Sequence, residues 1–146
     1  MATTIRRSAS ATWQGGGKDG QGALTTQSGT LRDTPYSAVA RFGEGRGTNP
    51  EELIAAAHAG CFTMALAFRL SGAGHVPESL RTEARVTMEQ EAAGGGWRIA
   101  AVVLSLRARA PGVPEDDFRR LAEGAKATCP VSRLLNAAIS LEATLE

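Results

Sequence analysis

The sequence predicts an α+β protein in which antiparallel β-sheet packs on one long hydrophobic helix. Two regions of alternating apolar and polar residues predict the sheet, and a stretch of about twenty mostly apolar residues between them predicts the helix. The chain has 146 residues, 42% of them hydrophobic, which is enough for the core of one domain. Neither a change in composition nor an internal repeat divides it, so a single domain over residues 1–146 is expected.

The N-terminal third predicts a small antiparallel meander. Alternation over residues 5–13 indicates a strand, and it is followed by a glycine-rich turn at 15–22, a strand at 23–27 and an extended segment at 36–42. Residues 15–20 formally match the G-x-G-x-x-G fingerprint of dinucleotide-binding proteins. That motif requires a helix directly after it, whereas the residues that follow here are typical of a strand. We therefore expect a hairpin loop rather than a nucleotide site.

The strongest local signal is the start of the long helix. Asn49 can cap it, Pro50 suits the first helical position, and Glu52 can close a capping box. The helix should run to about Leu70 and stop near Gly72 and Gly74. Its residues are apolar on every side, so we expect it to be buried on every side as the central element of the core.

The C-terminal half predicts a hairpin, two helical segments and a closing strand. The two hairpin strands are expected at 81–91 and 97–109, the helices from Pro114 and from Cys129, and the last strand at 139–145. One apolar stripe should anchor the first of these helices: Phe118, Leu121, Ala122 and Ala125. In the second, the residues expected to face inward are Val131, Leu134 and Leu135.

Composition argues against several function classes. Sixteen basic and fifteen acidic residues give a formal net charge of +1, without the concentrated basic footprint of a nucleic-acid-binding protein. The most apolar stretch, 53–70, is interrupted by polar residues, so a membrane span is not expected. Residues 1–13 lack the apolar run of a secretory signal, which predicts a cytoplasmic protein.

Cys61 and Cys129 are the only cysteines, and they are 68 residues apart. Two thiols make neither a CxxC motif nor a zinc site, so no metal is expected, and a reducing cytoplasm disfavours a structural disulfide. They are either two small core residues or a transient catalytic pair. Cys129 precedes Pro130 at a helix start, which favours its thiolate, whereas burial in the apolar helix raises the pKa of Cys61. From the residues alone, Cys129 is the nucleophile unless a cation reaches Cys61.

Two further side chains are candidates for the same site. His58 lies three residues before Cys61 and shares its helix face, so it is either the base of a thiol hydrolase or a core imidazole with one hydrogen bond. Arg41 lies in the approach to the helix, where the chain can fold back over it. Taken alone, Arg41 is a surface arginine.

Two blocks of the sequence resemble the OsmC/Ohr family, the osmotically inducible and organic hydroperoxide resistance proteins. The first block contains Pro35-Tyr36, Arg41-Phe42 and the run Gly47-Thr48-Asn49-Pro50-Glu51-Glu52-Leu53 continuing through His58-Ala59-Gly60-Cys61 to Leu66. The second is Cys129-Pro130-Val131-Ser132. The order of elements agrees over about residues 5–145, and Arg41 and His58 resemble the OsmC branch.

The resemblance implies an intertwined homodimer with sheets wrapped around central helices, and a thiol peroxidase active in oxidative and osmotic stress. Cys61 resembles the peroxidatic cysteine, which attacks an organic hydroperoxide, releases an alcohol and becomes a sulfenic acid. Cys129 resembles the resolving cysteine, which converts the sulfenic acid to a disulfide. An external dithiol of lipoyl type then reopens the disulfide, and no bound cofactor is implied.

The resemblance also reverses the roles that the residues alone suggest. Arg41 resembles the catalytic arginine, and Glu51 resembles the carboxylate that holds it in a bidentate contact, so that a cation offsets the burial of Cys61. Apolar side chains are expected around the site, although some of them must serve the core instead, and they favour bulky alkyl or aryl hydroperoxides: Phe42, Phe62, Met64, Leu66 and Phe68. The other interpretation of the cysteine pair is a redox-sensing or binding module without catalytic turnover.

Helix geometry adds a condition on this site. Glu51 and Cys61 are ten residues apart on one predicted helix, which separates them by about 15 Å along its axis. An arginine held by Glu51 cannot span that distance to Cys61 of the same chain. Two antiparallel copies of the helix about a two-fold axis would bring Glu51 of one beside Cys61 of the other, which predicts an obligate dimer with two shared sites.

Overall fold

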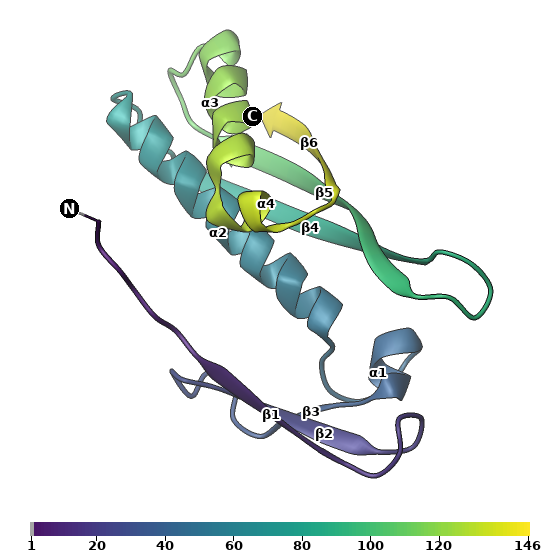
Figure 1. Ribbon diagram of the computed structural model, residues 1–146. Coiled ribbons are helices and arrows are strands. Elements are labelled where there is room, and N and C mark those ends of the chain that lie inside the picture. The colour runs from purple at the N-terminus through teal and green to yellow at the C-terminus, as the bar shows by residue number, and fades with distance from the viewer. Residues whose placement is uncertain (1) are drawn as a thin grey trace. The chain divides into compact units, whose positions relative to one another are not determined.

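Two separate three-stranded sheets organise the chain in the computed structural model, which describes residues 2–146 (Figure 1). They belong to two compact units, one ending at Leu53 and the other running from Ile54 to Glu146. The observed elements confirm the α+β class. That residues 1–146 make a single domain stays a prediction.

The N-terminal unit contains the expected antiparallel meander of β1 (Ala9–Gln14), β2 (Gln21–Thr26) and β3 (Thr34–Tyr36). The loop between β1 and β2 is followed by a strand and not by a helix, which confirms the hairpin. Gly22 lies opposite both Trp13 and Tyr36, whose rings meet edge to face at 5.3 Å. A Cβ at this position would collide with both rings, so close packing of the meander requires glycine there.

Two expectations for this unit are wrong. The segment 36–42 is not extended: it contains the short helix α1 (Ala38–Phe42), which starts because the Ser37 hydroxyl accepts a hydrogen bond from the Ala40 N–H at 3.1 Å. The first strand begins at Ala9 rather than at residue 5. The alternation of apolar and polar residues therefore made the first strand too long by four residues at its start. It also did not reveal the short helix that Ser37 caps.

The long helix α2 (Pro50–Gly72) confirms the predicted start and end. The Asn49 Oδ1 atom caps it by accepting a hydrogen bond from the Glu52 N–H at 2.8 Å. In a capping box the Glu52 carboxylate would accept from the backbone N–H of Asn49. It accepts instead from the Thr48 hydroxyl, at 2.6 Å, and so stabilises the start of the helix through the residue before the cap.

Burial of α2 on every side is wrong for the isolated chain. Its buried residues form a single stripe at intervals of four: His58, Phe62, Leu66 and Leu70. Met64 and Phe68, on other faces of the helix, are 63% and 73% exposed. By length and composition α2 could also cross a membrane, a property that it shares with the core helices of many proteins. The helix thus carries more apolar surface than one chain covers.

The C-terminal unit contains a mixed sheet where an antiparallel one was expected. Strands β4 (Ser79–Gln90) and β5 (Trp97–Arg109) form the predicted hairpin, with an irregularity between Thr87 and Met88. The last strand, β6 (Ala138–Leu145), runs parallel to β5. The reason is the connection between them, which contains α3 (Glu115–Thr128) and α4 (Pro130–Leu134) and is long enough for the crossover that parallel strands need.

The core of this unit lies where α2, β5 and α3 meet (Figure 1). The predicted stripe of α3 is confirmed, since all four of its members are buried. In α4 the inward-facing set was partly wrong: Val131 and Leu135 pack against the core, but Leu134 is 79% exposed and Ser132 is buried in its place. That exchange puts a hydroxyl beside the cysteine that precedes the helix.

Candidate functional site

The C-terminal unit brings the two cysteines together. Cys61 lies in the middle of α2, Cys129 lies directly before α4, and their sulfur atoms are 2.9 Å apart. Both are free thiols, and Cys129 is buried. A disulfide bond is about 2.05 Å long, so only a small approach of the sulfur atoms separates this arrangement from a covalent bond. Within one chain, Cys61 and Cys129 are therefore close enough to form the disulfide that the resemblance implies.

The surroundings of the two thiols shift their pKa values in opposite directions. Burial raises the pKa of Cys61, and the neighbouring Cys129 thiol raises it further, against a smaller opposing effect of the Val131 N–H. Burial also opposes ionisation of Cys129, but the Cys61 thiol, the N–H groups of Ser132 and Val131 and the Ser132 hydroxyl outweigh it and lower the pKa of Cys129. The structure thus confirms the electrostatic contrast expected from the residues. None of these contributions to the Cys61 pKa comes from a cation.

His58 is a core imidazole in this structure. It is fully buried one turn before Cys61, and its Nε2 atom lies 2.7 Å from the Ser132 Oγ atom. Burial lowers the pKa of His58, so the ring is neutral at physiological pH. Its Nδ1 atom is buried and has no hydrogen-bond partner among residues 2–146. This environment does not present His58 as the base of a thiol hydrolase.

Ser132 is the site residue to which sequence reasoning gave no role. It lies three residues after Cys129, the spacing at which a residue in the first turn of a helix comes back beside the residue that caps it. That spacing, together with the motif Cys129-Pro130-Val131-Ser132, is the signal that could have identified it.

The arginine and the glutamate come together in the N-terminal unit. Arg41, at the end of α1, donates from Nε and Nη2 to the two carboxylate oxygens of Glu51, at 2.8 and 3.2 Å. This is the expected bidentate contact, and it fixes the plane of the guanidinium. The Arg41 guanidinium also lies over the Phe42 ring, at 5.3 Å from its centroid. The side chain is partly exposed, so its positive charge is accessible to a ligand.

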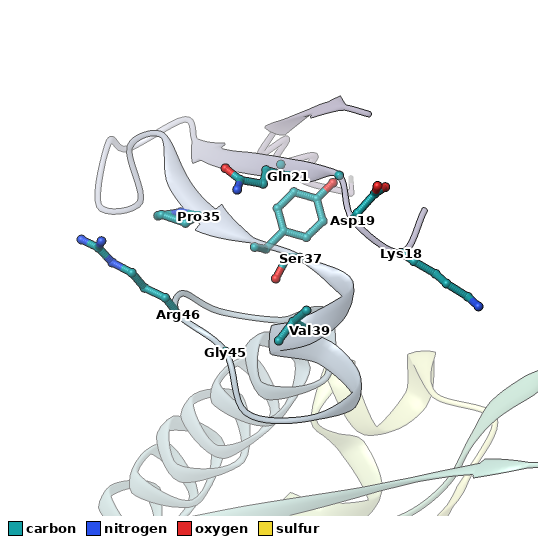
Figure 2. A pocket seen from close by; sticks show the side chains of 11 residues that line it. Lys18, Asp19, Gln21, Pro35, Ser37, Val39, Gly45 and Arg46 are labelled. Carbon is teal, nitrogen blue, oxygen red and sulfur yellow. The ribbon is translucent and has the colours of Figure 1, made fainter. Parts of the chain in front are cut away.

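Two cavities of the N-terminal unit differ in character. A small one of about 160 Å³ adjoins Arg41 and is lined by aromatic side chains that include Trp13, Tyr36 and Phe42. A larger one of about 530 Å³ lies by β2, β3 and α1, and Figure 2 shows that Lys18 and Arg46 at its rim extend away from each other. Of these two cavities, the smaller one has both Arg41 and aromatic side chains in its lining.

The apolar residues expected around the site divide between two roles. Phe62 and Leu66 are fully buried in the core of the C-terminal unit, so these two are among the residues that serve the core. Phe42 lines the small cavity beside Arg41.

Residues 2–146 contain no group of three or more histidine, cysteine or acidic side chains that could hold a metal ion.

Burial of neutral His58 predicts a loss of stability in acid. Because the folded state holds the pKa of His58 below its usual value of 6.5, the unfolded chain binds this proton first, and stability falls as the pH drops below that value. His58→Gln keeps a polar side chain that does not titrate. Between about pH 7.5 and about pH 5.5 the native protein should lose about 1 kcal/mol more unfolding free energy than this variant in urea titrations. Equal losses would contradict a buried, neutral His58.

Comparison with known proteins agrees with this geometry. Residues 43–144 match the family model described as OsmC-like protein. The chain is 42% identical over 143 residues to peroxiredoxin OsmC of Escherichia coli strain K12, covering 98% of this chain and 99% of that protein.

Two solved structures show the same fold. An organic hydroperoxide resistance protein of Elizabethkingia anophelis aligns over the whole of both chains, with 27% identity and a TM-score of 0.76. An OsmC-like protein of unknown function from Vibrio cholerae aligns with 97% of this chain and all of that one, with 16% identity and a TM-score of 0.78. The chain belongs to the OsmC-like protein family, in its OsmC branch.

Proposed function

We propose that this protein is a thiol peroxidase that reduces organic hydroperoxides to alcohols. The observation that carries the proposal is the pair of free thiols 2.9 Å apart, one in the middle of α2 and the other directly before α4. The peroxiredoxin of Escherichia coli, at 42% identity over nearly the full length, supports the same activity. The Elizabethkingia protein supports organic hydroperoxides as the substrate class.

The proposed cycle uses both thiols. The Cys61 thiolate attacks one peroxide oxygen, the O–O bond breaks, and the departing alkoxide takes a proton to become the alcohol, which leaves Cys61 as a sulfenic acid. The Cys129 thiolate then attacks the Cys61 sulfur, the S–O bond breaks, and the hydroxide released takes a proton to form water. An external dithiol, of lipoyl type, reduces the resulting disulfide by thiol–disulfide exchange. This requirement for a reducing dithiol favours the cytoplasm as the compartment.

Activation of Cys61 requires a positive charge. Burial raises the pKa of this thiol within the chain, and a nearby cation is the contribution that reverses such a shift. Arg41 is suited to the task, because Glu51 holds its guanidinium by two hydrogen bonds and leaves part of it accessible. Cys61 as the peroxidatic thiol, Cys129 as the resolving thiol and Arg41 with Glu51 as the activating pair make up the proposed site.

The cation is proposed to come from a second subunit. Glu51 lies in the first turn of α2 and Cys61 ten residues further along the same helix, about 15 Å of helical rise away. The exposed Met64 and Phe68 give α2 an apolar surface that a second copy of the helix would cover. An antiparallel pair of these helices makes an intertwined homodimer with two equivalent sites, each combining one subunit's cysteines with Arg41 and Glu51 of the partner subunit.

A turnover assay separates the enzyme from a redox sensor that uses the same cysteines. With a dihydrolipoyl donor, sub-stoichiometric protein should consume many equivalents of cumene hydroperoxide. Catalytic efficiency should be lower with hydrogen peroxide, because each buried methylene of a substrate adds about 0.8 kcal/mol of binding in an apolar site. Consumption that stops at one equivalent would identify a sensor, and equal efficiencies would contradict an apolar site.

Single cysteine variants test the order of the two thiols. Cys61→Ser should abolish turnover and the trapping of sulfenic acid by dimedone together, because it removes the attacking sulfur. Cys129→Ser should still consume one equivalent of peroxide and retain a sulfenic acid on Cys61 that mass spectrometry of the dimedone adduct locates. An adduct on Cys129 in the native protein or in Cys61→Ser would show that the electrostatics of the single chain, and not the resemblance, give the correct roles.

A further inference from the structure

A line of three polar groups leads from the buried histidine to the cysteine pair. The His58 Nε2 atom is 2.7 Å from the Ser132 Oγ atom, the Ser132 side chain is one of the groups that lower the pKa of Cys129, and the Cys129 sulfur is 2.9 Å from the Cys61 sulfur. His58, Ser132 and Cys129 are all buried in the same unit. The proposed cycle uses the sulfur atoms but gives the first two groups no task.

The direction of these hydrogen bonds follows from the number of protons available. A hydroxyl has one proton, and the Ser132 hydroxyl favours the Cys129 thiolate only when it donates that proton toward the sulfur. Ser132 must then accept the 2.7 Å hydrogen bond from His58, so the imidazole proton is on Nε2.

The environment of the second ring nitrogen agrees with this tautomer. A neutral imidazole with its proton on Nε2 has a bare Nδ1, and the Nδ1 atom of His58 is the buried side-chain atom without a partner among residues 2–146. In the opposite tautomer an N–H donor would be buried there without an acceptor, and orphaned buried N–H donors are rarer in proteins than under-satisfied acceptors.

We propose that His58 is a positioning residue for the resolving step, whose Nε2–H holds the Ser132 hydroxyl so that its hydrogen points at the Cys129 sulfur and stabilises the resolving thiolate. The role in catalysis rests on the proposed peroxidase cycle; the hydrogen-bond relay itself does not. His58 acts as a neutral donor, and it neither receives a proton from Cys129 nor touches the peroxide.

Within the cycle the relay acts after Cys61 has become a sulfenic acid. The Cys129 thiol loses its proton, the thiolate receives the Ser132 hydrogen bond, and its electron pair forms the S–S bond as the Cys61 S–O bond breaks. The hydroxide that leaves takes up one proton, equal to the proton that Cys129 lost, so one water is the net product. His58 and Ser132 keep their own protons throughout.

The other groups near Cys129 do not supply this function. Lys126 of α3 pairs with Glu123 at 3.0 Å, Arg69 of α2 donates to Thr128 at 2.9 Å, and Arg133 of α4 is exposed. The sheet contributes apolar side chains to the core around Cys129, including Val102 and Leu104 of β5. Within residues 2–146 of one chain, the titratable side chains that polar contacts link to Cys129 are therefore Cys61 and, through Ser132, His58.

A thiolate titration without peroxide tests the relay. In the Cys61→Ala background, absorbance at about 240 nm against pH reports the Cys129 thiolate alone. Ser132→Ala should lower the thiolate fraction about tenfold at a fixed pH below the transition, because a hydrogen bond to a charged group is lost. Ser132→Thr should restore it. Thr63→Val is the matched control, since it removes a hydroxyl of α2 that contacts Thr82 at 2.7 Å, and it should leave the titration unchanged.

His58 is then tested by its dependence on Ser132. His58→Leu should shift the titration in the same direction as Ser132→Ala, and His58→Gln, which presents an N–H near the Nε2 position, should restore it. Added to Ser132→Ala, His58→Leu should have no further effect, because His58 acts only through the hydroxyl. A full additional shift in the double variant, or an unchanged titration in Ser132→Ala, would overturn the relay.

The native protein provides a check that requires no substitution. Long-range ¹⁵N NMR of the imidazole should show the neutral tautomer with its proton on Nε2, and a proton on Nδ1 or an imidazolium at neutral pH would overturn the proposal. Neither readout uses peroxide. Failure of the turnover assay with an intact relay would therefore refute the proposed function alone, and the reverse result would refute the relay alone.

Discussion

Burial of Cys61 in the apolar surface of α2 is the constraint on which the rest of the site depends. The half-buried thiol in that position ionises with difficulty, since burial raises its pKa and no cation contributes to lowering it within the chain. The proposed peroxidase cycle therefore requires a positive charge beside a helix that is apolar on several faces. Arg41 has the chemistry for this, because two hydrogen bonds to Glu51 fix its guanidinium. In the proposed dimer, Arg41 of the partner subunit supplies the charge.

The second thiol is prepared by different means. Cys129 is also buried, yet its pKa is lowered by the Cys61 thiol and by the N–H groups and the hydroxyl that the short helix α4 places around it. The two sulfurs thus differ in what would stabilise their thiolates: the guanidinium of a second subunit for Cys61, as proposed above, and groups of the C-terminal unit itself for Cys129. In the proposed cycle, that division lets Cys61 react with the substrate while Cys129 is ready for the sulfenic acid that follows.

The sequence predicted the features that depend on local chemistry. Asn49 and Pro50 located the start of α2, and the stripe around Phe118 located the buried face of α3, because caps and helical periodicity act within a few residues. The resemblance identified Arg41, Glu51 and both cysteines as partners. Features that depend on distant packing were missed: β6 runs parallel to β5 because of the long connection, and Ser132 rather than Leu134 faces inward because it bonds to His58 across the unit. The prediction that α2 is buried on every side was wrong for one chain, because the helix has more apolar surface than that chain covers.

Mixed dimers test most directly the claim that each site is shared between two subunits. Cys61→Ser and Glu51→Ala proteins, each inactive alone, would be unfolded and refolded together, and heterodimers would be isolated by two different affinity tags. In a heterodimer one intact Cys61 faces one intact Glu51 across the interface, so the account predicts recovery of one working site, about half of the native activity per dimer. Proven heterodimers without activity would contradict it and would show that each site is built within a single chain.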